Sequence, residues 1–282
     1  MIDRRKKNAE IFSHTQSFYT FDLELINNIS QAIDNQVFIS EKSEVILPKA
    51  TKTEKAQIVV SGKRTFEAAE PYVKQGKKTC VLNFASATNA GGGVVNGSSA
   101  QEECLCRCST LYPCLRVDKL WKEFYLPHRE ANNPLYNNDC IYTPDVCVFK
   151  SDIDFPVLLY SNEWWKVNIL TCAAPNLRDK PSNAMNPNAG SKQAKITTQE
   201  LEKLLESRIR RIFEIAASNG NEVLILGAFG CGAFRNPPEV VAKVFNKVMQ
   251  EFVYYFDVIE YAVFHREGEL ANYEAFQKYI EL

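Results

Sequence analysis

A strand that runs into three consecutive glycines and then into a helix is the feature that most restricts the fold of this chain. The run Thr79–Ala85 is short, apolar and partly β-branched, which predicts a buried strand, and the residues after Ser99 predict a helix. Between them, Gly91–Gly93 lack the Cβ atoms that would keep a ligand away from the main chain. Because ligands bind at the carboxyl ends of strands in open α/β sheets, we expect a binding site at this loop.

Two acidic residues follow the glycine loop. Glu102 and Glu103 fall in the first turn of the predicted helix, where the helix dipole favours acidic side chains and Ser98 or Ser99 is expected to be the cap. Helix capping is therefore one explanation for the pair. The glycines directly upstream favour the other explanation, which is a binding or catalytic site.

A second glycine-rich loop of the same character lies within Asn221–Val241. Val223–Leu226 is predicted to form a strand, and Asn236, with two prolines after it, is predicted to cap the next helix. Backbone N–H groups at such a turn favour an anion, and the spacing matches neither the Walker nor the dinucleotide pattern. The two loops are expected to face one cavity. Ligand contacts in the second loop are predicted for Phe229, Gly230, Cys231, Gly232, Ala233 and Phe234.

The two phenylalanines of this loop have alternative interpretations. An aromatic ring beside glycine either stacks on a base or ribose or packs inward against the core. Stacking is favoured more for Phe234 than for Phe229.

Strands alternate with helices along the rest of the chain, which predicts a mostly parallel or mixed sheet covered by helices on both faces. A capping box at Thr197–Glu200 begins a long amphipathic helix. Residues 180–193 are rich in proline, asparagine and serine, and we interpret them as a plain surface loop rather than a cover over the site. Further strands are predicted at Ile58–Val60, Val146–Phe149, Val167–Thr171 and Val258–Phe264.

Composition restricts the kinds of partner. A chain of 282 residues with 45% hydrophobic residues can bury the core of one large domain. The net charge of −1 provides no global basic field for long polyanions or membrane surfaces, so recognition is expected to be local. The chain begins without the apolar run of a signal peptide and has no stretch of about 18 apolar residues, so a cytoplasmic protein is expected.

The nine cysteines fit reduced thiols better than a disulfide scaffold. A zinc cluster built from Cys104, Cys106, Cys108 and Cys114 is the alternative. On a helix, Cys106 points roughly 200° away from its two nearest neighbours, so the thiols cannot converge on one ion without unwinding. The three histidines are scattered and show no ligand spacing, so no metal is expected.

A family resemblance appears at the motif level. A triple glycine followed after seven residues by Gln-Glu-Glu is similar to the signature of bacterial-type poly(ADP-ribose) glycohydrolases, which have a macrodomain fold. Ala90 stands where that family usually has proline, and Phe229 where tryptophan is frequent. Further segments that resemble the family, in the expected order, are Ser109–Leu115, Tyr142–Lys150, Leu170–Asn176 and Gly227–Asn236.

The resemblance implies a single macrodomain-like domain over residues 1–282, a three-layer α/β/α mixed sheet with residues 1–50 as a helical N-terminal extension. It also implies hydrolysis of ribose–ribose O-glycosidic bonds of poly(ADP-ribose), mainly from chain ends, with release of ADP-ribose. Glu103 would protonate the leaving ribose oxygen, and Glu102 would hold ribose hydroxyls. The first loop would bind ligand through Asn89, Gly91, Gly92, Gly93, Asn96 and Gln101.

The implied partners are ADP-ribose and poly(ADP-ribose) on modified proteins. No cofactor, membrane or sequence-specific nucleic acid is expected as a partner. The protein is expected to be a monomer. Two other function classes remain open, a mono-ADP-ribosyl hydrolase and a macrodomain that binds ADP-ribose without hydrolysis. The intact Gln-Glu-Glu argues against a pure reader, whereas the two hydrolases need the same core and the sequence hardly separates them.

Overall fold

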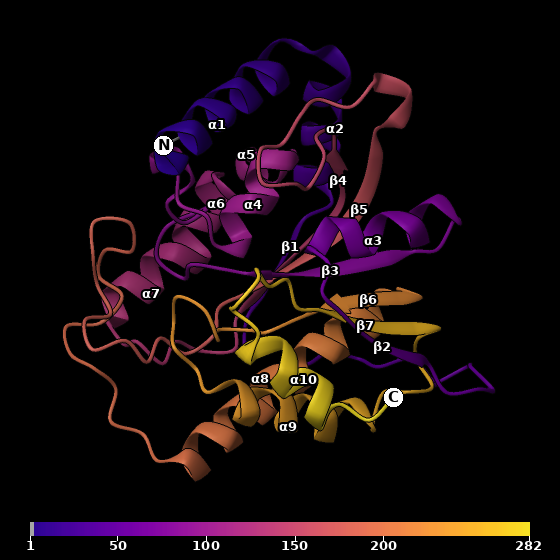
Figure 1. Cartoon of the computed structure of the whole chain (residues 1–282), viewed down its shortest axis with the longest axis vertical. Coiled ribbons are helices and arrows are strands. Elements are labelled where there is room, and N and C mark those ends of the chain that lie inside the picture. Colours follow the sequence, from indigo (N-terminus) through magenta and orange to yellow (C-terminus); the bar gives the residue numbers. More distant parts are fainter. Residues whose placement is uncertain (1–2) are drawn as a thin grey trace.

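The computed structural model describes residues 3–282 and contains one seven-stranded mixed sheet (Figure 1). The strand order is β1-β4-β5-β3-β6-β7-β2, with β1, β4 and β5 paired antiparallel and the other neighbours parallel. The expected mixed sheet is therefore confirmed. The strands are β1 (Val37–Ile39), β2 (Gln57–Ser61), β3 (Thr79–Phe84), β4 (Cys140–Val148), β5 (Trp165–Cys172), β6 (Val223–Leu226) and β7 (Val258–Ala262).

Helices cover both faces of the sheet, which gives the expected three layers (Figure 1). Helices α8, α9 and α10 pack on one face, and the helices of the first half of the chain pack on the other. The α-helices are α1 (Arg4–Phe21), α2 (Leu23–Asp34), α3 (Thr65–Lys74), α4 (Gln101–Cys108), α5 (Leu111–Leu115), α6 (Asp118–Leu120), α7 (Leu126–Ala131), α8 (Thr198–Ser218), α9 (Pro238–Met249) and α10 (Ala271–Tyr279). A π-helical segment, η2 (Trp121–Tyr125), and two short 3-10 segments, η1 (Val94–Asn96) and η3 (Ser161–Glu163), complete the elements.

Strand β3 carries core residues on both of its faces. Cys80 and Leu82 belong to the cluster under α8–α10, and Val81 between them belongs to the cluster on the other face. This explains why the strand is a continuous apolar run. Because β6 is its direct neighbour, the loops that leave the carboxyl ends of β3 and β6 lie next to each other.

Strand β4 is longer than the sequence indicates, because a bulge interrupts its pattern. Its register against β5 shifts between Thr143 and Val146, and Asp145 has a φ of +54°. The Pro-Asp pair in this bulge has the composition of a turn, so the strand was expected to begin only at Val146. Strand β1 and helix α10 are short peripheral elements that were not expected at all.

The expected serine cap of α4 is wrong. The cap position belongs to Ala100, which forms no side-chain cap hydrogen bond. Ser98 instead directs its hydroxyl to the Met185 sulfur at 2.9 Å. The acidic pair at the start of α4 therefore has no conventional capping arrangement around it.

The expected cap of α9 is wrong by one residue, since Pro237 occupies the cap position. The Asn236 amide points back into the loop and donates to the carbonyls of Pro175 (2.7 Å) and Gly230 (3.1 Å). Asn236 thus fixes the glycine turn rather than the helix.

The N-terminal helix α1 holds the back of the first glycine loop. Arg5 Nε donates to the Asn96 carbonyl at 2.8 Å, and Asn8 Nδ2 donates to the Gly97 carbonyl at 3.2 Å. Gly97 has a φ of +73°, and a Cβ at this position would run into the Arg5 carbonyl oxygen.

Among residues 3–282, α1 and every other helix are too short or too polar to span a membrane.

Gly97→Ala is expected to destabilise the protein more than Gly76→Ala. Both glycines have similar positive φ values, so both variants carry about 1 kcal/mol of backbone strain. A Cβ at Gly76 meets no atom within 4 Å in the described chain, whereas at Gly97 it would force α1 to move, at a further cost of about 1–3 kcal/mol. Urea unfolding of the two variants measures the difference, and equal losses of stability would show that α1 is not firmly seated on the loop.

Candidate active site

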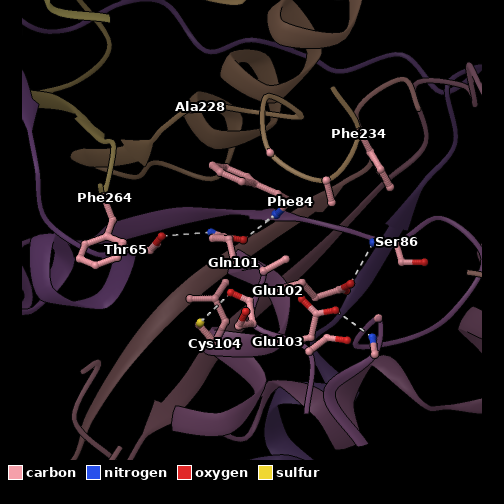
Figure 2. A pocket seen from close by; sticks show the side chains of 18 of the residues that line it. Thr65, Phe84, Ser86, Gln101, Glu102, Glu103, Cys104, Ala228, Phe234 and Phe264 are labelled. Carbon is pink, nitrogen blue, oxygen red and sulfur yellow. Dashed lines mark hydrogen bonds between the residues drawn. The ribbon is translucent and has the colours of Figure 1, made fainter. Parts of the chain in front are cut away.

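A cleft of about 1050 Å³ opens at the carboxyl ends of β3 and β6, with both glycine-rich loops in its wall (Figure 2). The expectation that the two loops face one cavity is confirmed. Of the predicted site residues, the cleft is lined by Gly92, Gly93, Gln101, Glu102, Glu103, Gly230, Gly232, Ala233 and Phe234.

Glu102 lies at the bottom of the cleft with 2% of its surface exposed. Its Oε2 accepts a hydrogen bond from the Ser86 N–H at 2.9 Å, and its Oε1 accepts one from Asn83 Nδ2 at 3.3 Å. Burial, and next the neighbouring charge of Glu103, raise the pKa of Glu102 to about 8. Glu102 is therefore largely protonated near neutral pH.

Glu103 is slightly more open, with 7% of its surface exposed. The Gly93 N–H donates to its Oε1 at 2.8 Å, which ties the carboxylate to the glycine loop. Burial raises the pKa of Glu103 above its usual range, and the hydrogen bond from Gly93 opposes that rise. Two buried carboxylates on adjacent residues titrate as a pair, so protonation of one influences the other.

The glycines of the first loop allow the main chain to approach this pair. A Cβ on Gly92 would lie 2.5 Å from Glu103 Oε1 and 3.2 Å from Glu102 Oε2. Gly92 also has a φ of +57°, which glycine adopts at least cost. A glycine at position 92 is thus required to fit beside the two glutamates.

Gln101 lines the cleft, but both ends of its amide are engaged within the protein. Its Oε1 accepts from the Phe84 N–H at 2.9 Å (Figure 2), and its Nε2 donates to the Leu82 carbonyl at 2.7 Å. Gln101 therefore joins the end of β3 to the first turn of α4. This geometry supports a positioning role in place of the expected direct contact with ligand.

Three predicted ligand residues of the first loop support it from outside the cleft. Asn89 Nδ2 donates to the carbonyls of Gly92 and Met185, and Asn96 gives its carbonyl to Arg5. Gly91 faces inward, because a Cβ there would lie 2.5 Å from the Tyr112 ring. The direct ligand contacts expected for these residues are not supported, since none of the three lines the cleft.

The second loop separates its two phenylalanines. Phe234 is half-buried in the wall of the cleft, where its ring is available to a ligand (Figure 2). Phe229 is fully buried and packs edge-on against Phe84 with ring centroids 5.8 Å apart. The ligand contact expected for Phe229 is therefore wrong, and Cys231 likewise lies outside the lining.

The loop interpreted as a plain surface segment closes part of the cleft. Residues 183–186 line it, and Asn186 Oδ1 accepts from the hydroxyls of Ser86 (2.7 Å) and Thr88 (2.6 Å). The interpretation failed because a proline- and asparagine-rich composition indicates a loop but not what the loop packs on. Sequence reasoning also missed the cleft-lining residues Ser86, Arg4, Arg64, Phe264 and Arg266, which come from four separate segments.

Among the described residues, no group of three or more histidine, cysteine or acidic side chains is placed to hold a metal ion. Cys106, Cys108 and Cys114 are buried, and Cys104 lies half-buried in the cleft wall, where it accepts from Arg107 Nη2 at 3.1 Å. The four thiols are thus ordinary packing groups of α4 and α5.

Comparison with known proteins agrees with this geometry. A family model described as the catalytic domain of microbial-type PARG, poly(ADP-ribose) glycohydrolase, matches residues 11–151. The glycohydrolase of Thermomonospora curvata has a TM-score of 0.84 and 27% identity, over 98% of this chain and 100% of that one. The glycohydrolase of Deinococcus radiodurans, solved in complex with ADP-ribose, has a TM-score of 0.75 and 29% identity. This match covers 90% of this chain and 97% of that one. A search of curated protein sequences found no match.

The family match covers half of the chain and includes the first glycine loop and both glutamates. The structural matches extend over almost the whole chain, including the α1–α2 extension and the second loop. The chain belongs to the microbial-type poly(ADP-ribose) glycohydrolase family.

Proposed function

We propose that this protein hydrolyses the ribose–ribose O-glycosidic bonds of poly(ADP-ribose), mainly from chain ends, and releases ADP-ribose. The observation that carries the proposal is the buried pair Glu102 and Glu103 at the start of α4, in a cleft walled by two glycine loops. The test is separate incubation with poly- and mono-ADP-ribosylated protein, followed by chromatography of the products. Early accumulation of ADP-ribose oligomers would indicate internal cutting of the polymer. Release of ADP-ribose from mono-modified protein alone would favour the alternative function, a mono-ADP-ribosyl hydrolase.

Glu103 is the proton donor. It is the more exposed member of the pair, and Gly93 holds its Oε1, so Oε2 is the oxygen that carries the proton. The bond between the ribose C1 atom and the bridging oxygen breaks, the oxygen takes the Glu103 proton, and an oxocarbenium-like ribose remains. Water attacks this carbon and returns a proton to Glu103.

Glu102 orients the ribose. Burial is the main cause of the raised pKa of both carboxyl groups, and the charge of Glu103 raises the pKa of Glu102 further. A two-carboxylate glycosidase places its groups about 5 to 9.5 Å apart on opposite sides of the sugar. Adjacent glutamates on one helix turn point roughly 100° apart, so one acid and one orienting group fit this site better.

The two glycine loops hold the diphosphate. Gly92 and Gly93 line one side of the cleft, and Gly230 and Gly232 line the other. The Gly92 and Gly93 N–H groups donate within the protein, to the Asn89 carbonyl and to Glu103. The first loop therefore confines the diphosphate sterically, and the second loop supplies oriented backbone N–H groups for its oxygens. Phe234 is the aromatic surface of this pocket for a ribose or base.

The remaining features of the proposal concern the whole protein. Residues 1–282 act as one catalytic domain, because α1 of the N-terminal extension contacts the loop that carries the glycines. Nine free cysteines fit a reducing cytoplasm. A monomer without a cofactor or sequence-specific nucleic acid is sufficient, since the cleft of a single chain contains both loops and both glutamates.

Glu103→Gln is expected to lower kcat by at least about 100-fold, the usual contribution of general acid catalysis. ADP-ribose affinity should stay within a few-fold of wild type, because the acid acts in the transition state. Product chromatography and calorimetry measure the two quantities, with Glu123→Gln on the exposed side of η2 as the control. Near-normal turnover would remove Glu103 from its assigned role.

The stability of Glu102→Gln relative to the wild type is expected to increase as pH rises. The folded pKa of about 8 lies above the ordinary value of 4.5, so the native state keeps a proton that the unfolded chain loses. Wild-type stability therefore falls between about pH 4.5 and 8, and glutamine removes that loss, on the order of 1–3 kcal/mol near pH 7. Tm values of both proteins from pH 5 to 8 test this, and a difference independent of pH would contradict it.

Gly232→Ala is expected to weaken ADP-ribose binding about 10-fold without changing Tm. A Cβ at this position meets no atom within 4 Å from elsewhere in residues 3–282, and its φ lies outside the left-handed region. The added methyl group should therefore disturb only a ligand that lies against the loop. Calorimetry with ADP-ribose tests this, with adenosine, which lacks the diphosphate, as the control ligand. Unchanged ADP-ribose affinity would place the diphosphate elsewhere.

A further inference from the structure

A buried histidine behind the cleft has an oxygen atom at each of its ring nitrogens. His128 lies in the last turn of α7 with 4% of its surface exposed. Its Nδ1 is 2.7 Å from the Phe124 carbonyl oxygen, and its Nε2 is 2.8 Å from Asn137 Oδ1. A backbone carbonyl only accepts hydrogen bonds, so Nδ1 carries a proton. Whether Nε2 also carries one depends on the orientation of the Asn137 amide.

The orientation of the Asn137 amide is fixed by Asp139. The Asp139 N–H donates to Asn137 Oδ1 at 3.0 Å, and Asn137 Nδ2 donates to Asp139 Oδ2 at 2.8 Å. A flipped amide would face an N–H with its own NH2 group and a carboxylate with its oxygen, so both hydrogen bonds would be lost. The amide oxygen therefore faces His128, and both nitrogens of the ring donate.

A neutral imidazole cannot make both contacts, because it has only one N–H. Its other nitrogen would direct a lone pair at an oxygen atom 2.7 or 2.8 Å away. The imidazolium ion makes both contacts, and positive charge is favourable in the last turn of a helix. Asp139, which is 6% exposed, supplies the compensating negative charge through the Asn137 amide.

The tyrosines and arginines around the ring keep one charge state near neutral pH. Burial raises the pKa of Tyr136, whose ring packs against that of His128, and the pKa of Tyr125, which follows Phe124 in the chain. Arginine side chains stay charged in proteins. The charged side chains nearest this part of the chain are Asp139, Glu41, Arg129 and Arg208.

Tyr136 connects His128 to the cleft. The centroid of its ring is 5.8 Å from that of His128 and 6.1 Å from that of Phe234. Its hydroxyl accepts from Nδ2 of Asn186, which lies in the segment that covers part of the cleft, at 3.4 Å. Tyr136 has a φ of +55°, which an aromatic residue keeps only where its surroundings hold it. A shift of this turn therefore moves both the aromatic wall and the covering segment.

We propose that His128 is an imidazolium at neutral pH and a positioning residue, which holds Tyr136 and, through it, Phe234 in the arrangement that binds ligand. The inference rests on the proposed function, in which Phe234 is the aromatic surface for a ribose or base. The protonated ring joins the last turn of α7 to the turn that carries Tyr136 and Asn137. Loss of the proton breaks one of the two hydrogen bonds and releases one end of this connection.

The protonation state is measured on the wild-type protein at pH 7.5 by 15N NMR of labelled histidines. An unperturbed histidine is about 10% protonated at this pH. Partial burial and the nearby charge of Lys150 lower the pKa of His14, so His14 is the neutral reference in the same spectrum. We expect a proton on both nitrogens of His128, whose signals are assigned by elimination with His14→Gln and His265→Gln. A neutral His128 would overturn the inference.

The positioning role is measured by calorimetry with ADP-ribose at the same pH. Glutamine at position 128 has no charge and one NH2 group in place of two ring donors. His128→Gln should therefore weaken ADP-ribose binding roughly 2- to 10-fold, as for the loss of one hydrogen bond. The loss should disappear in the Phe234→Ala background, because residues that act through one another are not additive. His14→Gln, at an exposed position, should leave the affinity unchanged.

A merely structural role for His128 would lower the Tm of His128→Gln and leave the affinity of the folded protein unchanged. That result, or an equal loss of affinity in both backgrounds, would overturn the positioning role. If His128→Gln does not fold, the same comparison is made by pH. Affinity should fall over the pH range in which NMR shows His128 losing its proton, and by more in the wild type than in Phe234→Ala, where the titration of Glu102 still acts.

Hydrolysis of poly(ADP-ribose) by the wild-type protein is assayed in parallel. Its absence refutes the proposed function and leaves the NMR result standing, whereas hydrolysis together with a neutral His128 refutes only the present inference.

Discussion

The hydrogen bond from the Gly93 N–H to Glu103 Oε1 sets how closely the loop after β3 approaches the first turn of α4. The rest of the site is arranged around this contact. Gly92 has no room for a side chain beside the two carboxylates, and Gln101 joins the helix to the end of β3. From behind, α1 holds the loop through Arg5. Gly92 is therefore a packing requirement of the glutamate pair as well as part of the cleft wall.

Burying two adjacent carboxylates opposes folding, and the raised pKa of Glu102 expresses that cost. The structure offsets part of it with donors from β3 and the residues that follow it, namely Asn83 Nδ2 and the Ser86 N–H. Burial also raises the pKa of Glu103, the residue proposed as the acid, and so favours the protonated form that cleavage of a glycosidic bond needs. Stability and the chemistry proposed for the site thus place opposite demands on the pair of carboxyl groups.

The wall of the cleft contains two kinds of polar groups. Near the glutamates, it is lined by the glycine main chain that follows two neighbouring strands. Arg4, Arg64 and Arg266 also line it, and all three contact Asp154. Backbone N–H groups carry partial charges in fixed positions, whereas guanidinium groups carry full charges on long side chains.

Much of the fold and the centre of the site follow from local sequence. The apolar run of β3, the three glycines and the two glutamates are near neighbours along the chain, so periodicity and backbone preference predicted strand, loop and helix in the right order. The same holds for β6 and its glycine turn. Local signals failed where a bulge disturbed the pattern of β4. They also failed where the Asn236 side chain donates to carbonyls of Pro175 and Gly230 and does not accept from the N–H groups of the helix it was expected to cap.

What the sequence by itself determined is therefore the strand–loop–helix unit that carries Glu102 and Glu103, because the conformational preferences of those residues act over a few positions. Only the tertiary structure decided which aromatic ring faces the cleft. Phe229 and Phe234 share one glycine-rich loop, and packing against Phe84 buries the first. It also placed residues 183–186 over the cleft and gathered arginines 4, 64 and 266 around Asp154. Contacts between segments so far apart in sequence depend on how the chain packs, which local preferences do not specify.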